Sequence, residues 1–75
     1  MAVSAELVDD CLRLLGPSHP YTLTARAHLA RWQGESGDAL RAVATGTELL
    51  DDQVRVLGAD HPDTFITRNN LAHWR

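Results

Sequence analysis

The sequence lacks most of the features that would signal a reactive site or a secreted protein. It has one cysteine among 75 residues, so no internal disulfide can form. Lysine is absent, and the seven basic residues are all arginine, spread through the chain. No run of 18 or more apolar residues occurs, which predicts that the chain does not span a membrane. Residues 1–6 carry no basic region followed by an apolar one, so we expect no signal peptide and a cytoplasmic protein.

The charge balance argues against nucleic acid as a partner. The net charge is −3 and the isoelectric point is about 5.7, whereas a nucleic-acid-binding domain gathers basic residues on one face. Hydrophobic residues make up 44% and charged residues 23%, which are ordinary values for a folded domain. A chain this short forms at most one domain, residues 1–75, and buries only about 60% of its unfolded surface. We therefore expect one small domain of marginal stability.

Motifs of catalysis and metal binding are also missing. The sequence has no glycine-rich phosphate loop and no nucleophile elbow, so we expect no enzyme activity and no cofactor. His19 and His61 each precede a proline, and we interpret them as helix caps rather than metal ligands. His28 and His73 stand apart from any Cys/His/Asp cluster with ligand spacing, so we expect no metal site.

The chain does contain an internal repeat. Residues 15–22 recur as residues 57–64, 42 positions later, and the similarity extends to both sides. When residues 7–32 are aligned with residues 49–74, 13 of the 26 positions are identical. A period of this size is typical of arrays in which each unit buries its apolar face only against its neighbours. The function is therefore expected on an extended surface.

Apolar residues at spacings of three and four predict an all-α fold with four helices. The expected helices cover about residues 4–15, 20–33, 38–57 and 62–75. The expected N-caps are Ser4, Ser18 or His19, and Asp38, and the glycines at 16 and 58 end the first and third helices. The four-residue turn at 34–37 requires its flanking helices to be antiparallel neighbours. No period-two alternation indicates a strand.

Two sets of residues on these helices suggest how they pack. Cys11 shares a helical face with Val8 and Leu15, and we interpret it as a small buried hydrophobe rather than a redox or nucleophilic group. The third helix carries a stripe of small residues that would let another helix approach closely. This stripe consists of Ala39, Ala42 and Gly46.

Several of these residues resemble the tetratricopeptide repeat pattern. Leu29 and Ala30, followed by Gly37 and Ala42, match its large residue, small residue, turn glycine and second-helix alanine. The 42-residue period and the phrase Leu-Gly-x-x-His-Pro-x-Thr are similar to the kinesin-light-chain-like subclass, which is common in actinobacterial proteins. The resemblance implies antiparallel helix hairpins stacked as a right-handed superhelical array. This chain would hold one complete repeat and two halves.

The resemblance also implies a concave binding surface for a peptide or a helix of a partner protein, lined by the first helix of each repeat. Carried over to this chain, that surface consists of Thr24, Ala27, Arg31, Ile66, Asn69 and His73. The amide of Asn69 both donates and accepts hydrogen bonds, which suits a peptide main chain, and Arg31 suits a carboxylate. The alternative interpretation is that both are ordinary solvated surface residues. Only the second copy has the paired amides Asn69 and Asn70, because the first has Ala27 and His28 there.

Charged residues recur at equivalent positions of the two copies. Arg26 corresponds to Arg68, and the acidic pair 9–10 corresponds to the pair 51–52. We interpret this set as structural ion pairs between stacked helices, with ligand contact as the alternative. Exposed pairs of this kind contribute only about 0–1 kcal/mol, so their main effect is on register.

The ends of the expected array suggest self-association. Trp32 and Trp74 are equivalent, and each is expected to pack against the next helix. Without that helix, Phe65, Leu71 and Trp74 would face water. An uncapped repeat end of this kind exposes apolar surface and tends to associate with other molecules. We therefore expect a homo-oligomer formed by end-to-end stacking or helix exchange.

The sequence thus favours a protein-interaction module that binds a peptide or helix of a partner protein. One alternative is a structural unit that assembles through its open ends. Another is a regulatory segment of a larger signalling ATPase or transcription regulator.

Overall fold

The computed structural model describes residues 5–75, which form four α-helices and no strand. The helices are α1 (Ala5–Leu15), α2 (Pro20–Glu35), α3 (Ala39–Leu57) and α4 (Pro62–Trp74). The predicted all-α fold is therefore confirmed for this part of the chain. Helix α2 runs two residues further than expected, to Glu35. The expected start of the first helix at residue 4, with Ser4 as its cap, lies outside the described residues.

The repeated phrase folds in the same way in both copies. His19 and His61 are the N-caps of α2 and α4, and their backbone angles nearly coincide (φ −65°, ψ 136° and φ −66°, ψ 139°). The Nδ1 atom of each imidazole accepts a hydrogen bond from the backbone N–H two residues later, at 3.1 and 3.0 Å. Gly16 and Gly58 precede them with φ of +87° and +95°, a region that favours glycine. The predicted capping role of both histidines is confirmed.

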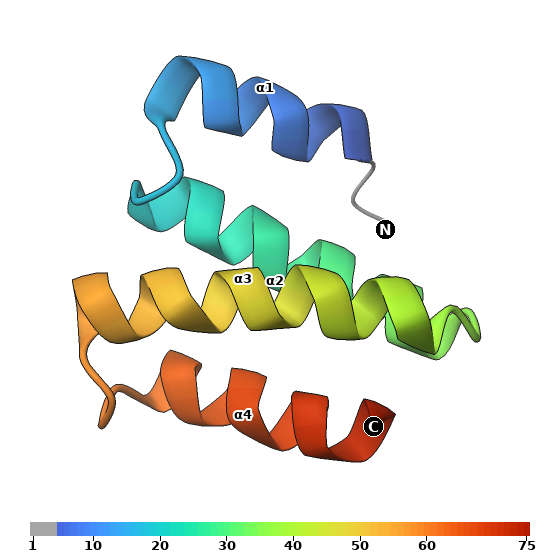
Figure 1. Ribbon diagram of the computed structural model, residues 1–75. Helices are drawn as coiled ribbons and strands as arrows, with labels where there is room; N and C mark the ends of the chain where they lie inside the picture. Colours follow the sequence, from blue (N-terminus) through green and yellow to red (C-terminus); the bar gives the residue numbers. More distant parts are fainter. Residues whose placement is uncertain (1–4) are drawn as a thin grey trace.

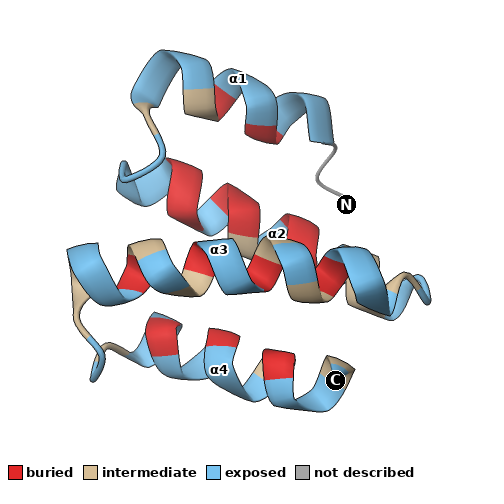
Figure 2. Ribbon diagram, viewed as in Figure 1, coloured by how far each residue is buried: buried red, intermediate tan, exposed pale blue. Residues whose placement is uncertain are grey.

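Each helix lies antiparallel to the next, and α1, α2, α3 and α4 follow one another across the molecule (Figure 1). Contacts join α1 to α2, α2 to α3 and α3 to α4, and α2 also touches α4. The two helices that begin with the His-Pro phrase therefore run in the same direction, with α3 packed against both. This arrangement determines burial: much of α2 is buried, while the outer sides of α1 and α4 are exposed (Figure 2).

Helix α2 is buried on two faces, one for each neighbour. On the first face, Thr22 donates a hydrogen bond to the Cys11 carbonyl of α1 at 3.3 Å, and Ala25 and Leu29 join the core cluster that contains Cys11. Cys11 is buried in this cluster, which confirms its interpretation as a small packed hydrophobe. The second face of α2 lies against α3. It carries Leu23, Arg26 and Ala30, all buried.

An ion pair holds α2 and α3 together. The Arg26 guanidinium lies 2.6 Å from Oδ2 of Asp52, and both side chains are largely buried. Arg26 also donates to the Pro17 carbonyl at 3.2 Å, and Arg55 donates to the other carboxylate oxygen of Asp52. The predicted structural pairing between helices is confirmed for Arg26 and Asp52.

Glycine allows α4 to approach its neighbours closely. A Cβ atom added at Gly46 would lie 2.8 Å from Cδ2 of Leu71, and one added at Gly34 would collide with the indole of Trp74. Leu71 is consequently only 2% exposed, so the expectation that it faces water is wrong. Trp74 is half-buried for the same reason. Of the expected small-residue stripe on α3, Ala42 and Gly46 are buried, whereas Ala39 is exposed.

We predict that Arg26→Ala lowers the free energy of unfolding by about 3 kcal/mol, because it leaves the Asp52 carboxylate without its buried partner. Arg68→Ala is the matched control: Arg68 is the repeat equivalent of Arg26 but is exposed, so its effect should stay within about 0.5 kcal/mol. Urea denaturation of dilute protein measures both. Equal losses in the two variants would show that the Arg26–Asp52 pair does not hold these helices together.

We predict that Gly34→Ala displaces the Trp74 indole into solvent, because the added methyl group occupies the space of the ring. In a Trp32→Phe background, the fluorescence of Trp74 should shift to longer wavelength and become more sensitive to iodide quenching. In a Trp74→Phe background, the same Gly34→Ala change should leave the emission of Trp32 unaltered. An unmoved Trp74 spectrum would contradict the close contact.

Candidate functional site

A groove lies between the parallel helices α2 and α4, and α3 forms its floor. Its volume is about 390 Å³, which falls within the range of about 300–1,000 Å³ typical of ligand pockets. The floor residues are Leu49, Gln53 and Leu57, and the two walls come from one flank of α2 and one flank of α4. The groove is therefore built from helices of both copies of the repeat.

Gln53 is the unusual residue of the floor. It is only 2% exposed, and its Oε1 atom is buried without a hydrogen-bond partner among the described residues. Its repeat equivalent on α1 is Cys11, which fills a similarly buried position with an apolar group. The fold therefore does not require an amide at this position. Rotation of the terminal amide exchanges its oxygen and nitrogen, so Gln53 can offer either a donor or an acceptor to the groove.

The α2 wall contains the three residues predicted for it. Thr24, Ala27 and Arg31 all line the groove. Two of these side chains also have partners within the molecule. Thr24 donates to the Pro20 carbonyl at 3.1 Å, and Arg31 lies 3.1 Å from the exposed carboxylate of Glu35.

The α4 wall differs from the predicted one. Ile66 lines the groove as expected, but Asn69 and His73 lie outside it, and Asn70 takes part instead. The reason is geometric: the two parallel helices lie on different sides of the groove, so the flanks that they turn toward it coincide only in part, as for Thr24 and Ile66. Equivalent positions on α2 and α4 therefore cannot all face it. The available signal for Asn70 was its place in the amide pair with Asn69.

Three further α4 residues line this wall without having been predicted. They are Asp63, Thr67 and Trp74. Asp63 lies near the start of α4 and Arg31 near the end of α2, and because these helices are parallel (Figure 1), the two charges mark opposite ends of the groove. The groove thus combines an apolar floor, two side-chain amides and opposite charges at its ends.

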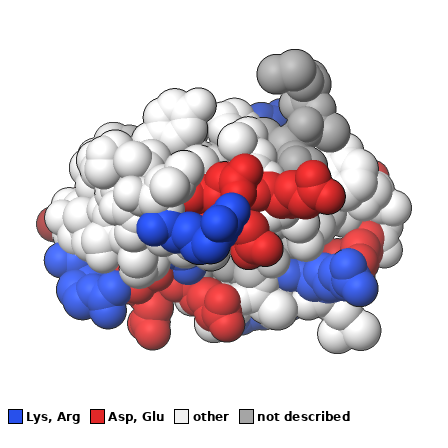
Figure 3. Space-filling view, turned by 90° about the horizontal axis from the view of Figure 1, so that it is seen from above, with Lys and Arg blue, Asp and Glu red and all other residues white. Residues whose placement is uncertain are grey.

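The outer surface at the α1 end has a mixed charge. Figure 3 views the molecule from this side and shows acidic and basic side chains next to one another. Arg13 forms an ion pair with Asp10, one turn earlier on α1. Of the six residues predicted for peptide binding, none lies on α1.

Metal ligands and membrane spans can be assessed for residues 5–75. No group of three or more His, Cys, Asp or Glu side chains comes together there in a way that could hold a metal ion. None of the helices in this range combines the length and apolar character needed to cross a membrane.

Comparison with known proteins returns no match to any protein-family model, to any curated protein or to any solved structure.

Proposed function

We propose that this chain is a peptide-binding module of tetratricopeptide type, in which the groove between α2 and α4 holds a segment of a partner protein. The observation that carries the proposal is the buried, unpartnered amide of Gln53 on the groove floor. A right-handed superhelical stacking of the hairpins belongs to the same proposal, as does the tetratricopeptide family resemblance.

Gln53 raises the free energy of the folded chain, because its buried amide oxygen has no hydrogen-bond partner among the described residues. A buried acceptor without a hydrogen bond destabilises a protein by about 1–3 kcal/mol. The position equivalent to Gln53 is filled by Cys11 in α1, so an apolar residue would serve the fold at lower cost. A bound peptide offsets this cost, because its main chain supplies the N–H or C=O group that the amide lacks.

The walls support the same type of ligand. Asn70, on the α4 wall, is the second amide of the groove after Gln53 on the floor. Apolar surface comes from Leu49, Leu57 and Ile66. Amides placed along an apolar groove pair with main-chain groups regardless of the peptide side chains. Arg31 and Asp63, at opposite ends, favour one orientation of a charged peptide over the other.

We predict that Gln53→Met raises the free energy of unfolding by about 1 kcal/mol, because it removes the unsatisfied amide while keeping an unbranched side chain. The same change should weaken peptide binding by about tenfold, because the ligand loses its partner on the floor. The probe is a peptide selected from a random phage-displayed library on the wild-type protein. A destabilised variant, or one with unchanged affinity, would contradict the assigned role of Gln53.

We predict that Asn70→Ala weakens binding of the selected peptide by about three- to tenfold, the effect of one hydrogen bond. Asn69→Ala is the matched control, since Asn69 is the neighbouring amide but lies outside the groove. Isothermal titration calorimetry measures both affinities, and circular dichroism checks that helicity is retained. Equal effects of the two changes, or failure of the library to yield any binder, would refute this use of the groove.

A further inference from the structure

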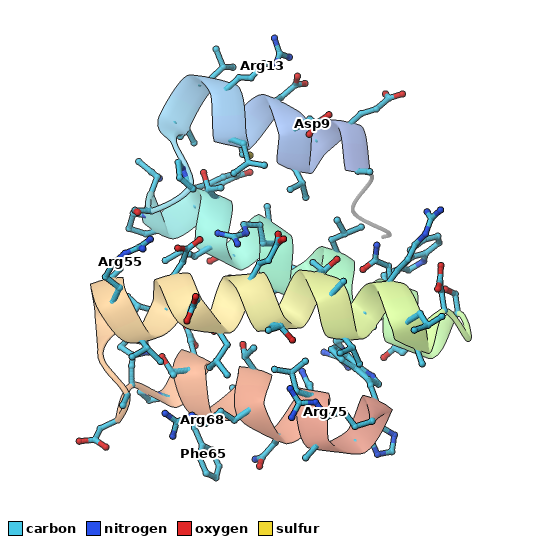
Figure 4. The ribbon with its side chains drawn as sticks, viewed as in Figure 1. Asp9, Arg13, Arg55, Phe65, Arg68 and Arg75 are labelled. Carbon is cyan, nitrogen blue, oxygen red and sulfur yellow. The ribbon has the colours of Figure 1, made fainter. Side chains whose placement is uncertain are left out.

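One face of α4 is exposed where the equivalent face of α2 is buried. Leu23 on α2 is 3% exposed, whereas its equivalent Phe65 is 60% exposed. Arg26 is buried, whereas Arg68 is exposed and forms no ion pair or hydrogen bond with any described residue. The difference has a simple cause: α3 covers this face of α2, and no described helix covers it on α4. Figure 4 shows Phe65 and Arg68 extending from α4 on the side away from α3.

The complementary face lies at the other end of the molecule, on α1. This helix is the repeat equivalent of the last part of α3, so Asp10 corresponds to Asp52 and Leu14 to Val56. The Asp52 side chain is 16% exposed beneath Arg26, whereas that of Asp10 is 52% exposed. Leu14 is also exposed.

The carboxylates of Asp10 and Asp52 share one hydrogen bond and differ in the other. Oδ1 of Asp10 accepts a hydrogen bond from Arg13, as Oδ1 of Asp52 does from Arg55. Oδ2 of Asp52 accepts the second bond, from Arg26 at 2.6 Å. Oδ2 of Asp10 accepts none from the described residues. The chain thus displays an arginine at one end and a carboxylate at the other, each missing the partner that its equivalent has.

We propose that a second copy of this chain binds head to tail, with its α1 lying on the exposed face of α4 as α3 lies on α2. Arg68 of one copy then pairs with Asp10 of the next, which repeats the Arg26–Asp52 bond between molecules. Phe65 is covered in this interface, as Leu23 is within the chain, and Leu14 is partly covered, since its equivalent Val56 is 42% exposed. Helix α1 corresponds to residues 47–57 of α3, so it covers the half of α4 that carries Phe65 and Arg68.

The charge complementarity between the two faces favours a second copy of this chain as the occupant. The two faces belong to one repeat pattern, so each copy carries a pair of surfaces that fit each other and not themselves. A face of α4 pressed against another α4 would bring two Arg68 side chains together, which is unfavourable. Contacts between unlike surfaces at opposite ends do not close after two copies, so chains of copies grow with concentration.

The first experiment reverses the two charges and measures association by sedimentation velocity over a range of concentrations. Arg68→Asp and Asp10→Arg should each lower the association constant by about 30-fold or more. The double variant, with the charges exchanged, should associate more tightly than either single variant. Arg41→Asp is the control, because it makes the same charge change on an exposed arginine of α3 and should leave association as in the wild type.

The second experiment blocks one end at a time. Phe65→Glu places a carboxylate on the α4 face, and Leu14→Glu places one on the α1 face; both positions are exposed, so folding should be retained. Each variant alone should be a monomer, and an equimolar mixture should form a 1:1 dimer that grows no further. Leu14→Glu dimers formed without the other variant would indicate a symmetric α4–α4 contact and overturn the proposal.

The head-to-tail proposal would also be overturned if the wild-type protein stayed monomeric at every concentration. The same holds if the double charge variant had an association constant no higher than those of the single variants. The Asn70→Ala variant separates this proposal from peptide binding, because it lies in the groove and should associate like the wild type. Loss of peptide binding with retained association, or the reverse, would show that one proposal fails while the other stands.

Discussion

Helix α2 needs a helix on each of two faces, and most of the structure follows from that requirement. One face meets α1 through Thr22, Ala25 and Leu29, and the other meets α3 through the largely buried pair of Arg26 and Asp52. An arginine in such a position is stable only when its charge is paired and its remaining donors are used. The bond to the Pro17 carbonyl meets part of that need. Helix α4 repeats the sequence of α2, and so it repeats the requirement. Among the described helices α3 packs against it and α2 touches it, but none covers the face that carries Phe65 and Arg68.

The groove arises from the same packing. Because α3 contacts both α2 and α4, the two parallel helices are held side by side with the inner surface of α3 between them. That surface would be fully apolar if α3 copied α1, since Cys11 occupies the position of Gln53. Cysteine at this buried position of α1 gives a surface suited only to packing. Glutamine at the same position of α3 gives a surface that can also form a hydrogen bond. The two copies are therefore alike in fold and unlike in chemistry.

Much of this architecture could be predicted from the sequence. The helix boundaries follow from local signals, because Gly16, Gly58 and the His-Pro pairs act on the backbone within a few residues. The Arg26–Asp52 pair could be anticipated because the charges recur with the repeat. The flank of α4 that faces the groove could not be predicted from the sequence. Periodicity shows which residues share a face, but it does not show how one helix is rotated against another. Burial of Leu71 and Trp74 was missed for a related reason: it depends on Gly46 and Gly34, which are distant in sequence and adjacent only after folding.

The peptide groove and the end faces of α1 and α4 use different positions of the 42-residue repeat. In a stack of copies, the two kinds of surface therefore stay distinct. Where two copies meet, α4 of one and α2 of the next would flank a second groove whose floor is α1 of the next copy. Cys11 stands on that floor in the position of Gln53, so the groove between copies has no buried amide to pair with a peptide main chain. Peptide sites in the stack would therefore remain one per chain, each within a single copy. Stacking and peptide binding would then add to each other without competing for the same groups.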